Sequence, residues 1–150
     1  MATLLSKYIL LPFFAVISVC GFAQSGFYLT YSCKEGDAGI LKIDRTRKGL
    51  CATSQPIVTV ADVHSVSQPI ELGTDFFFDI HLTERGFLKL EQVYDLTKVI
   101  VFKVDDQPVF LMDTEKNRLA GTIRVYIGGR RDVAQIHAAL ARELELSRGR

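Results

Sequence analysis

Two cysteines, Cys33 and Cys51, are the residues of this chain whose type and spacing most directly suggest covalent chemistry. The third cysteine, Cys20, lies in an apolar leader, so removal of that leader would leave an even number. An even count in an oxidising compartment favours a disulfide. Such a bridge would close a loop of 18 residues and contribute about 3 kcal/mol if it acts through chain entropy. We therefore expect a Cys33–Cys51 disulfide, with two separate thiols as the alternative.

The other groups that commonly bind metals or catalyse reactions do not form a recognisable motif. Neither cysteine has a histidine or a second cysteine at the spacing of a zinc site, and the pair is not a Cys-x-x-Cys redox motif. The histidines His64, His81 and His137 form no pair at metal-ligand spacing. The sequence contains neither a nucleophile elbow nor a phosphate-binding glycine loop. We predict no catalytic, cofactor-binding or metal site, with a hydrolase assembled from distant residues as an alternative.

Three further residues are candidate contacts for a partner protein. Phe77 lies in the middle of a run of three phenylalanines and alternates away from the apolar face of a predicted strand. It therefore either contacts a partner or packs inside the protein. Asp105 and Asp106 fall in a turn between two predicted strands, where adjacent acids usually face water. We do not expect these two acids to act as paired catalytic carboxylates.

The leader has the three-part layout of a secretory signal. A short stretch ending in Lys7 precedes an apolar run. After that run, the small residues Gly21 and Ala23 occupy the two positions that a signal peptidase recognises before its cleavage site. The apolar run is shorter than the roughly 20 residues that span a bilayer. We predict a signal peptide over residues 1–23 and a periplasmic or secreted bacterial protein. A lipoprotein anchored at Cys20 and an uncleaved anchor are the alternatives.

Charge restricts the class of partner. Removing residues 1–23 removes one lysine and no acid, which leaves 17 basic and 17 acidic residues. A neutral chain lacks the basic surface that nucleic-acid binding requires. We expect no nucleic-acid partner, and contact with a membrane only through the signal or a lipid on Cys20.

The rest of the chain alternates between strand and helix patterns. In residues 76–82, one face is wholly apolar, as a half-buried strand requires. A helix follows with Thr83 as its predicted N-cap and an apolar stripe that runs to Thr97. A last helix is predicted from Asp132, which we expect to cap it. The remaining expectations are strands over 26–32, 40–43, 57–60, 99–104, 108–112 and 119–127, with an irregular connector over 62–69.

These elements predict an α+β fold. The expected architecture is a two-layer sandwich, in which a mainly antiparallel sheet carries two amphipathic helices on one face. We divide the chain into a signal peptide over 1–23, an N-terminal β extension over 24–49 and the α+β domain over 50–147.

The order of these signals resembles a known family, the periplasmic head subdomain of SecD, an accessory subunit of the bacterial protein-export machinery. Four segments carry the resemblance. They are a proline-containing strand with an Asp-bearing turn (50–63), a strand that leads through an acid and a glycine into a helix (78–86), a hydrophobic strand with an acidic turn and a returning strand (99–109), and a closing helix from Asp132. The match spans roughly residues 50 to 146.

The resemblance implies a small exported module that contacts protein or unfolded polypeptide. It does not imply a translocation motor, because SecD uses many membrane spans and this sequence shows none after the leader. Our leading hypothesis is therefore a non-enzymatic periplasmic binding or accessory module, acting through a sheet edge or an exposed apolar groove. The alternative is a secreted inhibitor or immunity-type protein that binds a single toxin or hydrolase.

Overall fold

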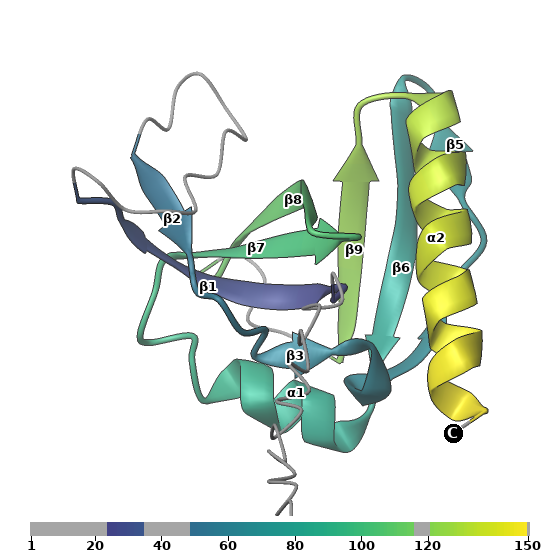
Figure 1. Cartoon of the computed structure of the whole chain (residues 1–150). Coiled ribbons are helices and arrows are strands. Elements are labelled where there is room, and N and C mark those ends of the chain that lie inside the picture. Colours follow the sequence, from purple (N-terminus) through teal and green to yellow (C-terminus); the bar gives the residue numbers. More distant parts are fainter. Residues whose placement is uncertain (1–23, 35–48, 116–120, 150) are drawn as a thin grey trace, which may run out of the picture.

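Strands from distant parts of the chain form two antiparallel sheets that pack together with two α-helices (Figure 1). The computed structural model describes residues 24–34, 49–115 and 121–149. The predicted α+β fold class is confirmed, although the strands divide between two sheets instead of forming one. The predicted strand over 40–43 lies outside the described residues.

In the larger sheet, the first strand of the described chain lies between two other strands. The order of this sheet is β2–β1–β7–β8, and β3 also pairs with β1. The bounds are β1 Gly26–Ser32, β2 Leu50–Ala52, β3 Val58–Thr59, β7 Val99–Val104 and β8 Gln107–Asp113. Because β1 pairs with β7, β2 and β3, the segment predicted as an N-terminal extension shares this sheet with strands of the predicted domain.

The smaller sheet is built around the long strand β6, Asp75–Leu82. On one side β6 pairs with β9, Thr122–Ile127, and on the other it pairs with β4, Val63–Val66, and β5, Ile70–Leu72. The prediction of an irregular connector over 62–69 was wrong, because β4 occupies part of it. Neither β4 nor β5 is long enough to show a clear alternation, and the hydrogen bonds that define them come from β6.

The core lies between the two sheets and the C-terminal helix. Phe78 and Ile80 of β6 are fully buried, as the predicted alternation requires. Phe27 of β1 stacks on Phe102 of β7 with ring centroids 4.7 Å apart. The same cluster includes Val58, Ile100, Met112, Ile123, Val125, Leu140 and Leu144. Each such aliphatic or aromatic side chain contributes about 1.5–3 kcal/mol through burial.

The first helix, α1, spans Glu84–Glu91 and begins as predicted. The hydroxyl of Thr83 accepts a hydrogen bond from the backbone N–H of Gly86 at 3.1 Å, which confirms the N-cap. The helix ends earlier than the predicted stripe. The N–H groups of Val93 and Tyr94 bond to carbonyls three residues back, so tight turns replace the α-helix there.

The second helix, α2, spans Arg130–Arg148 and packs against the smaller sheet and the short 3-10 helix η1, Val60–Asp62 (Figure 1). Its N-cap is Gly129, so the prediction that Asp132 caps the helix was wrong. Asp132 instead lies in the first turn, where a negative charge favours the positive end of the helix. Burial of Leu140 and Leu144 follows the predicted stripe.

Candidate functional site

The predicted site residues lie in three separate places. Cys33 and Cys51 form a disulfide with Cα atoms 5.2 Å apart, which joins the end of β1 to β2. Phe77 lies on β6 in the smaller sheet, whereas Asp105 and Asp106 connect β7 to β8 in the larger sheet. The structure therefore brings the cysteines together and does not gather the proposed contact residues into one site.

Asp105 and Asp106 form the two-residue loop of a hairpin. Their φ angles are 49° and 62°, and positive values at both central positions are typical of a type I′ turn. Asp106 forms an ion pair with Lys103 at 3.3 Å. The ammonium of Lys103 also lies 4.6 Å from the ring centroid of Tyr28. Both acids are exposed, and their contact with a partner stays a prediction.

Phe77 belongs to a row of aromatic and aliphatic side chains that crosses the outer face of the smaller sheet. The pairing register places Ile70 of β5, Phe77 of β6 and Tyr126 of β9 opposite one another. Phe77 is only 5% exposed, and its ring centroid lies 5.5 Å from that of Tyr126. This favours the packing interpretation of Phe77, and a direct partner contact by its ring stays a prediction.

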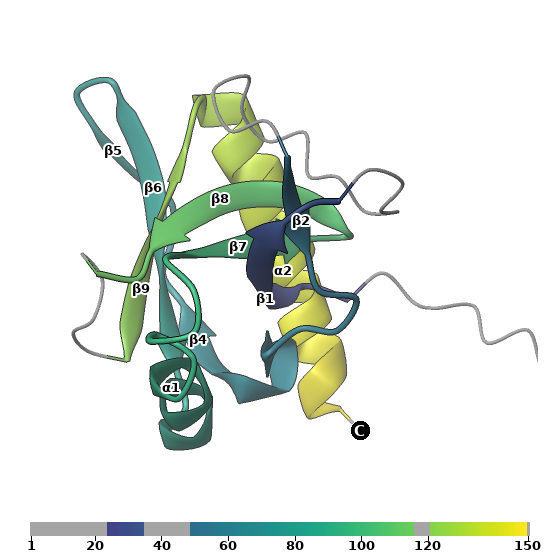
Figure 2. The ribbon, with the colours of Figure 1, turned by 90° about the vertical axis from the view of Figure 1, so that its left-hand side faces the viewer.

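The neighbours of Phe77 in this row are far more accessible. Ile70 is 42% exposed, Leu72 is 69% exposed and Tyr126 is 48% exposed. Ile70 and Leu72 lie on β5, which forms a protruding hairpin with β6 (Figure 2). We call Ile70, Leu72, Phe77 and Tyr126 the outer apolar row. Sequence analysis missed Ile70 and Leu72 because β5 has only three residues.

Polar pairs border the outer apolar row on the same face. Arg124 donates two hydrogen bonds to the carboxylate of Asp79, at 2.8 and 3.1 Å, and its guanidinium carbon lies 4.2 Å from the ring centroid of Phe77. The hydrogen bonds from Arg124 hold the pKa of Asp79 below its usual range, although partial burial opposes them. His81 Nδ1 and Thr122 Oγ1 share a hydrogen bond at 2.9 Å. These pairs fix the cross-strand register beside the row.

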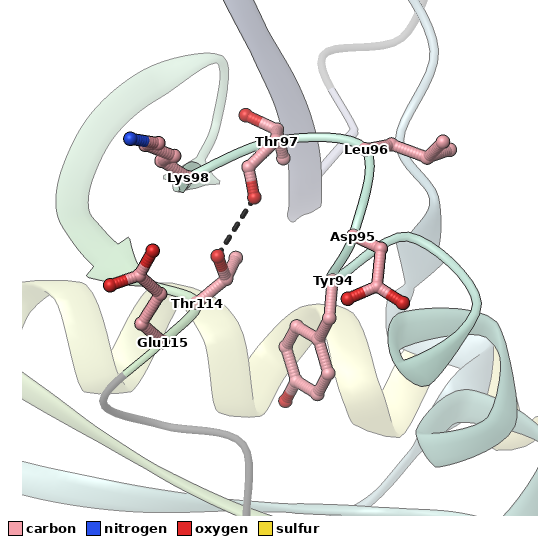
Figure 3. A pocket seen from close by; sticks show the side chains of 7 residues that line it. All are labelled: Tyr94, Asp95, Leu96, Thr97, Lys98, Thr114 and Glu115. Atoms are coloured by element: carbon pink, nitrogen blue, oxygen red, sulfur yellow. Dashed lines mark hydrogen bonds between the residues drawn. The ribbon is translucent and has the colours of Figure 1, made fainter.

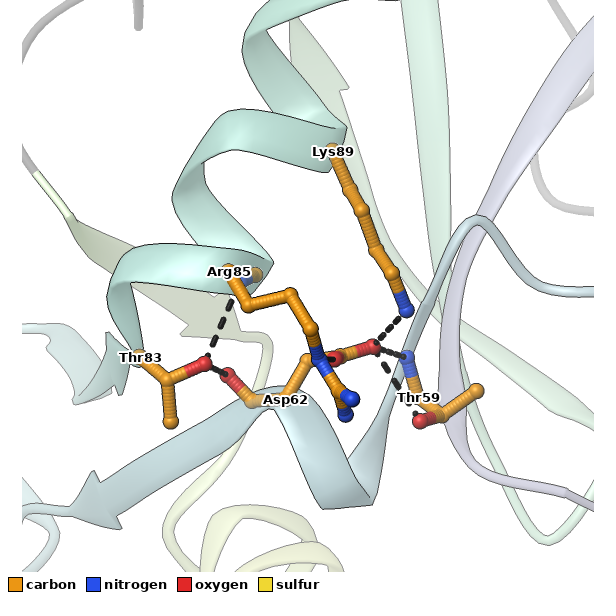
Figure 4. A network of polar contacts seen from close by, with 6 residues as sticks. Thr59, Asp62, Thr83, Arg85 and Lys89 are labelled. Atoms are coloured by element: carbon orange, nitrogen blue, oxygen red, sulfur yellow. Dashed lines mark hydrogen bonds and ion pairs between the residues drawn. The ribbon is translucent and has the colours of Figure 1, made fainter.

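A second polar cluster surrounds Asp62, at the point where η1 meets α1 (Figure 4). The Asp62 side chain is fully buried, and its carboxylate accepts hydrogen bonds from Arg85 at 2.8 Å and Lys89 at 2.7 Å. The backbone N–H of Thr59 donates to it at 3.1 Å and the Thr59 hydroxyl at 3.2 Å. The carbonyl oxygen of Asp62 accepts from the N–H of Thr83 at 2.8 Å. The cluster therefore ties η1 to the first turn of α1.

Electrostatics explain why a buried carboxylate is tolerated here. Burial by itself would raise the pKa of Asp62, but the hydrogen bonds from Lys89, Thr59 and Arg85 outweigh it and lower that pKa below its usual range. Sequence analysis gave Asp62 no partner. The available signals were the threonine three residues before it, which is a capping-box spacing, and two cations four residues apart on the next helix. The geometry indicates a structural role for this cluster.

A pocket of about 460 Å³ opens beside the connection from α1 to β7 (Figure 3). It is lined by residues 94–98 together with Thr114 and Glu115. The Thr114 hydroxyl donates to the carbonyl of Thr97 at 2.8 Å, and the Thr97 hydroxyl donates to the carbonyl of Val99 at 2.8 Å. Because both hydroxyls are engaged by the backbone, neither is placed as an activated nucleophile.

Neither a metal-binding cluster nor a membrane-spanning helix occurs in the described part of the chain. Within it, no group of three or more histidine, cysteine or acidic residues could hold a metal ion. No helix in residues 24–34, 49–115 or 121–149 combines the length and apolar character needed to cross a membrane.

Comparison with known proteins shows a likeness in fold. The sequence matches no protein-family model and no curated protein. Among solved structures, the chain is similar to a crystal structure of SecDF in its super-membrane-facing form, with a TM-score of 0.50 and 15% sequence identity over 79% of this chain. The matched region is 18% of the SecDF chain, so this protein spans a small part of that protein's length. The chain has a SecDF-like fold.

Proposed function

We propose that this chain is an exported, non-enzymatic module of the SecD head-subdomain type, which binds extended segments of other polypeptides. The observation that carries the proposal is the outer apolar row, where Ile70, Leu72 and Tyr126 expose apolar surface beside a strand edge. The SecDF-like fold supports a module related to protein export. Clustered exposed apolar residues are a common feature of protein-binding surfaces.

The outer edge of strand β5 is the second feature that supports this function. In the described part of the chain, β5 pairs with β6 on one side, and no strand pairs with its other side. An unpaired edge presents backbone N–H and C=O groups to which an extended segment can add as a further strand.

The side chains of β5 differ between its two faces. Ile70 and Leu72 lie on the outer face, whereas Glu71 between them pairs with Arg130 of α2. An added strand would therefore meet apolar side chains on the outer face and an ion pair on the inner face. Backbone pairing gives such binding little dependence on sequence, and the apolar row would favour segments with alternating apolar side chains.

Binding to an unfolded chain tests the proposal directly. The probe is reduced, carboxymethylated lactalbumin, a polypeptide that cannot refold, and the readout is fluorescence anisotropy of the labelled probe. We expect saturable binding by the wild-type exported protein and at least tenfold weaker binding by Leu72→Glu. The matched control is Leu146→Glu, because Leu146 is 61% exposed but lies on α2.

Two results would contradict the proposal. One is equal loss of affinity in both variants, which would mean that the effect is not specific to the outer apolar row. The other is no affinity of the wild-type protein for the probe. Tight binding to one folded toxin or hydrolase, with none to the probe, would favour the inhibitor or immunity-type alternative instead.

A further inference from the structure

Gln24 and Ser25, the first described residues, are held in place although they precede β1. The Tyr28 hydroxyl donates to the carbonyl of Gln24. The N–H of Ser25 donates to Oε1 of Glu143 at 3.2 Å, and Ser25 Oγ accepts from the N–H of Asp105 at 3.2 Å. Ser25 is fully buried. The start of the described chain is thus fixed to both α2 and the β7–β8 turn.

Only one of the two oxygens of the Glu143 carboxylate takes part in these contacts. Its Oε1 atom accepts the bond from Ser25, whereas Oε2 is buried and has no hydrogen-bond partner among the described residues. A buried carboxylate oxygen without a donor is unfavourable. Lys103, the cation on the neighbouring hairpin, is already engaged by Asp106 and the Tyr28 ring. Oε2 is therefore placed to accept a further donor close to Ser25.

We propose that Glu143 binds the α-ammonium group that cleavage after Ala23 creates on Gln24. This proposal rests on the cleavage position predicted from the leader and is separate from polypeptide binding. Hydrolysis adds water across the Ala23–Gln24 peptide bond, which leaves a carboxylate on Ala23 and an amine on Gln24. The amine takes a proton at neutral pH. One amide donor is thereby replaced by a cation with three donors.

The position of Gln24 makes this contact accessible. Backbone bond lengths place the nitrogens of adjacent residues less than about 4 Å apart. The nitrogen of Ser25 is already bonded to Glu143, so the new ammonium needs only a short reorientation to reach Oε2. The Tyr28 hydroxyl holds the Gln24 carbonyl during this change. Processing would therefore complete a partly buried ion pair that the precursor lacks, and the mature chain would be the more stable form.

The titration of the α-amine tests this inference. The full chain is exported from a bacterial host as wild type, Glu143→Gln and Glu145→Gln, and intact mass identifies the first residue. Reductive methylation with ¹³C-formaldehyde labels the amine and keeps its charge, so NMR can follow its titration. We expect the α-amine pKa to lie about one unit above the ordinary value of about 7.7–8.0 in wild type. The exposed Glu145 is the matched control, and only Glu143→Gln should return the pKa to the ordinary range.

A second measurement applies acetylation to the same three proteins. Acetylation of the α-amine removes its charge, and we expect it to lower the urea midpoint of the wild-type protein and of Glu145→Gln. Acetylation should leave the midpoint of Glu143→Gln unchanged. A mature chain that begins at another residue, a cyclised Gln24, or an α-amine pKa that is the same in wild type and Glu143→Gln would each overturn the proposal. None of these results bears on binding at the outer apolar row.

Discussion

The backbone of Asp62 lies directly against Gly86 of α1. A Cβ added at Gly86 would come within 2.5 Å of the Asp62 carbonyl oxygen and 3.0 Å of its Cβ. The same carbonyl accepts hydrogen bonds from the N–H and the hydroxyl of Thr83. The glycine therefore permits η1 to contact the first turn of α1 at a distance that no other residue allows.

Replacing Gly86 with alanine should destabilise the fold even though alanine favours helices by about 1 kcal/mol. The clash is with backbone, which cannot move aside cheaply, so we expect Gly86→Ala to lower the free energy of unfolding by about 2–3 kcal/mol. Urea denaturation measures this change. Gly128→Ala is the control, because nothing lies within 4 Å of a Cβ added there. Equal stability of the two variants would show that the contact between η1 and α1 is not rigid.

Removing the charge of Asp62 should also destabilise the protein. Asp62→Asn keeps the size of the side chain but weakens the bonds to Arg85 and Lys89, and we expect a loss of about 2 kcal/mol in urea denaturation. Arg85→Gln should cost less than about 1 kcal/mol, because the Arg85 side chain is mostly exposed. A larger effect of the arginine variant than of the aspartate variant would contradict this account of the cluster.

Stability should fall in acid. The pKa values of Asp62 and Asp79 are lower in the folded protein than in the unfolded chain. Their contribution is therefore fully present above the unfolded value of about 3.9 and is lost as pH falls through the folded pKa. We expect the free energy of unfolding to be steady from about pH 5 to 7 and to decline below about pH 4. The decline should be shallower in Asp62→Asn, and an unchanged pH profile in that variant would contradict the assignment.

The disulfide should stabilise the protein. Its loop of 18 residues predicts a loss of about 3 kcal/mol when Cys33 and Cys51 are both replaced by serine. Thermal unfolding with and without reductant measures the effect. Reductant should destabilise the wild-type protein and have no effect on the double variant. A wild-type protein that is insensitive to reductant and carries two titratable thiols would show that the bridge does not form.

The amino-acid pattern predicts those parts of the fold that depend on local periodicity. The alternation in β6 and the Thr83 cap of α1 follow from side-chain spacing and a single hydrogen bond, and both are confirmed. The strands β4 and β5 could not be predicted, because they are short and exist through pairing with β6. Helix α2 begins before its predicted start, because aspartate is favourable both at the N-cap and in the first turn of a helix. The presence of Asp132 therefore did not identify which residue is the cap.

The candidate site was harder to predict than the fold. Phe77 lies on the face of the smaller sheet that carries the outer apolar row, but its exposed neighbours come from β5 and β9, which only the pairing register brings beside it. The Asp62 cluster likewise joins residues more than 20 positions apart in the sequence. Contacts of this kind depend on tertiary packing, which local sequence patterns do not specify.

Site-specific crosslinking tests the central claim most directly. A photoreactive amino acid is placed at position 72 on β5 or, as the control, at position 146 on α2. The protein is expressed with its own leader in a bacterial host, and the cells are illuminated while a radiolabelled polypeptide crosses into the periplasm. We predict crosslinks to the entering polypeptide from position 72 and none from position 146. Equal crosslinking from both positions, or crosslinking from position 146 alone, would contradict binding at the outer apolar row.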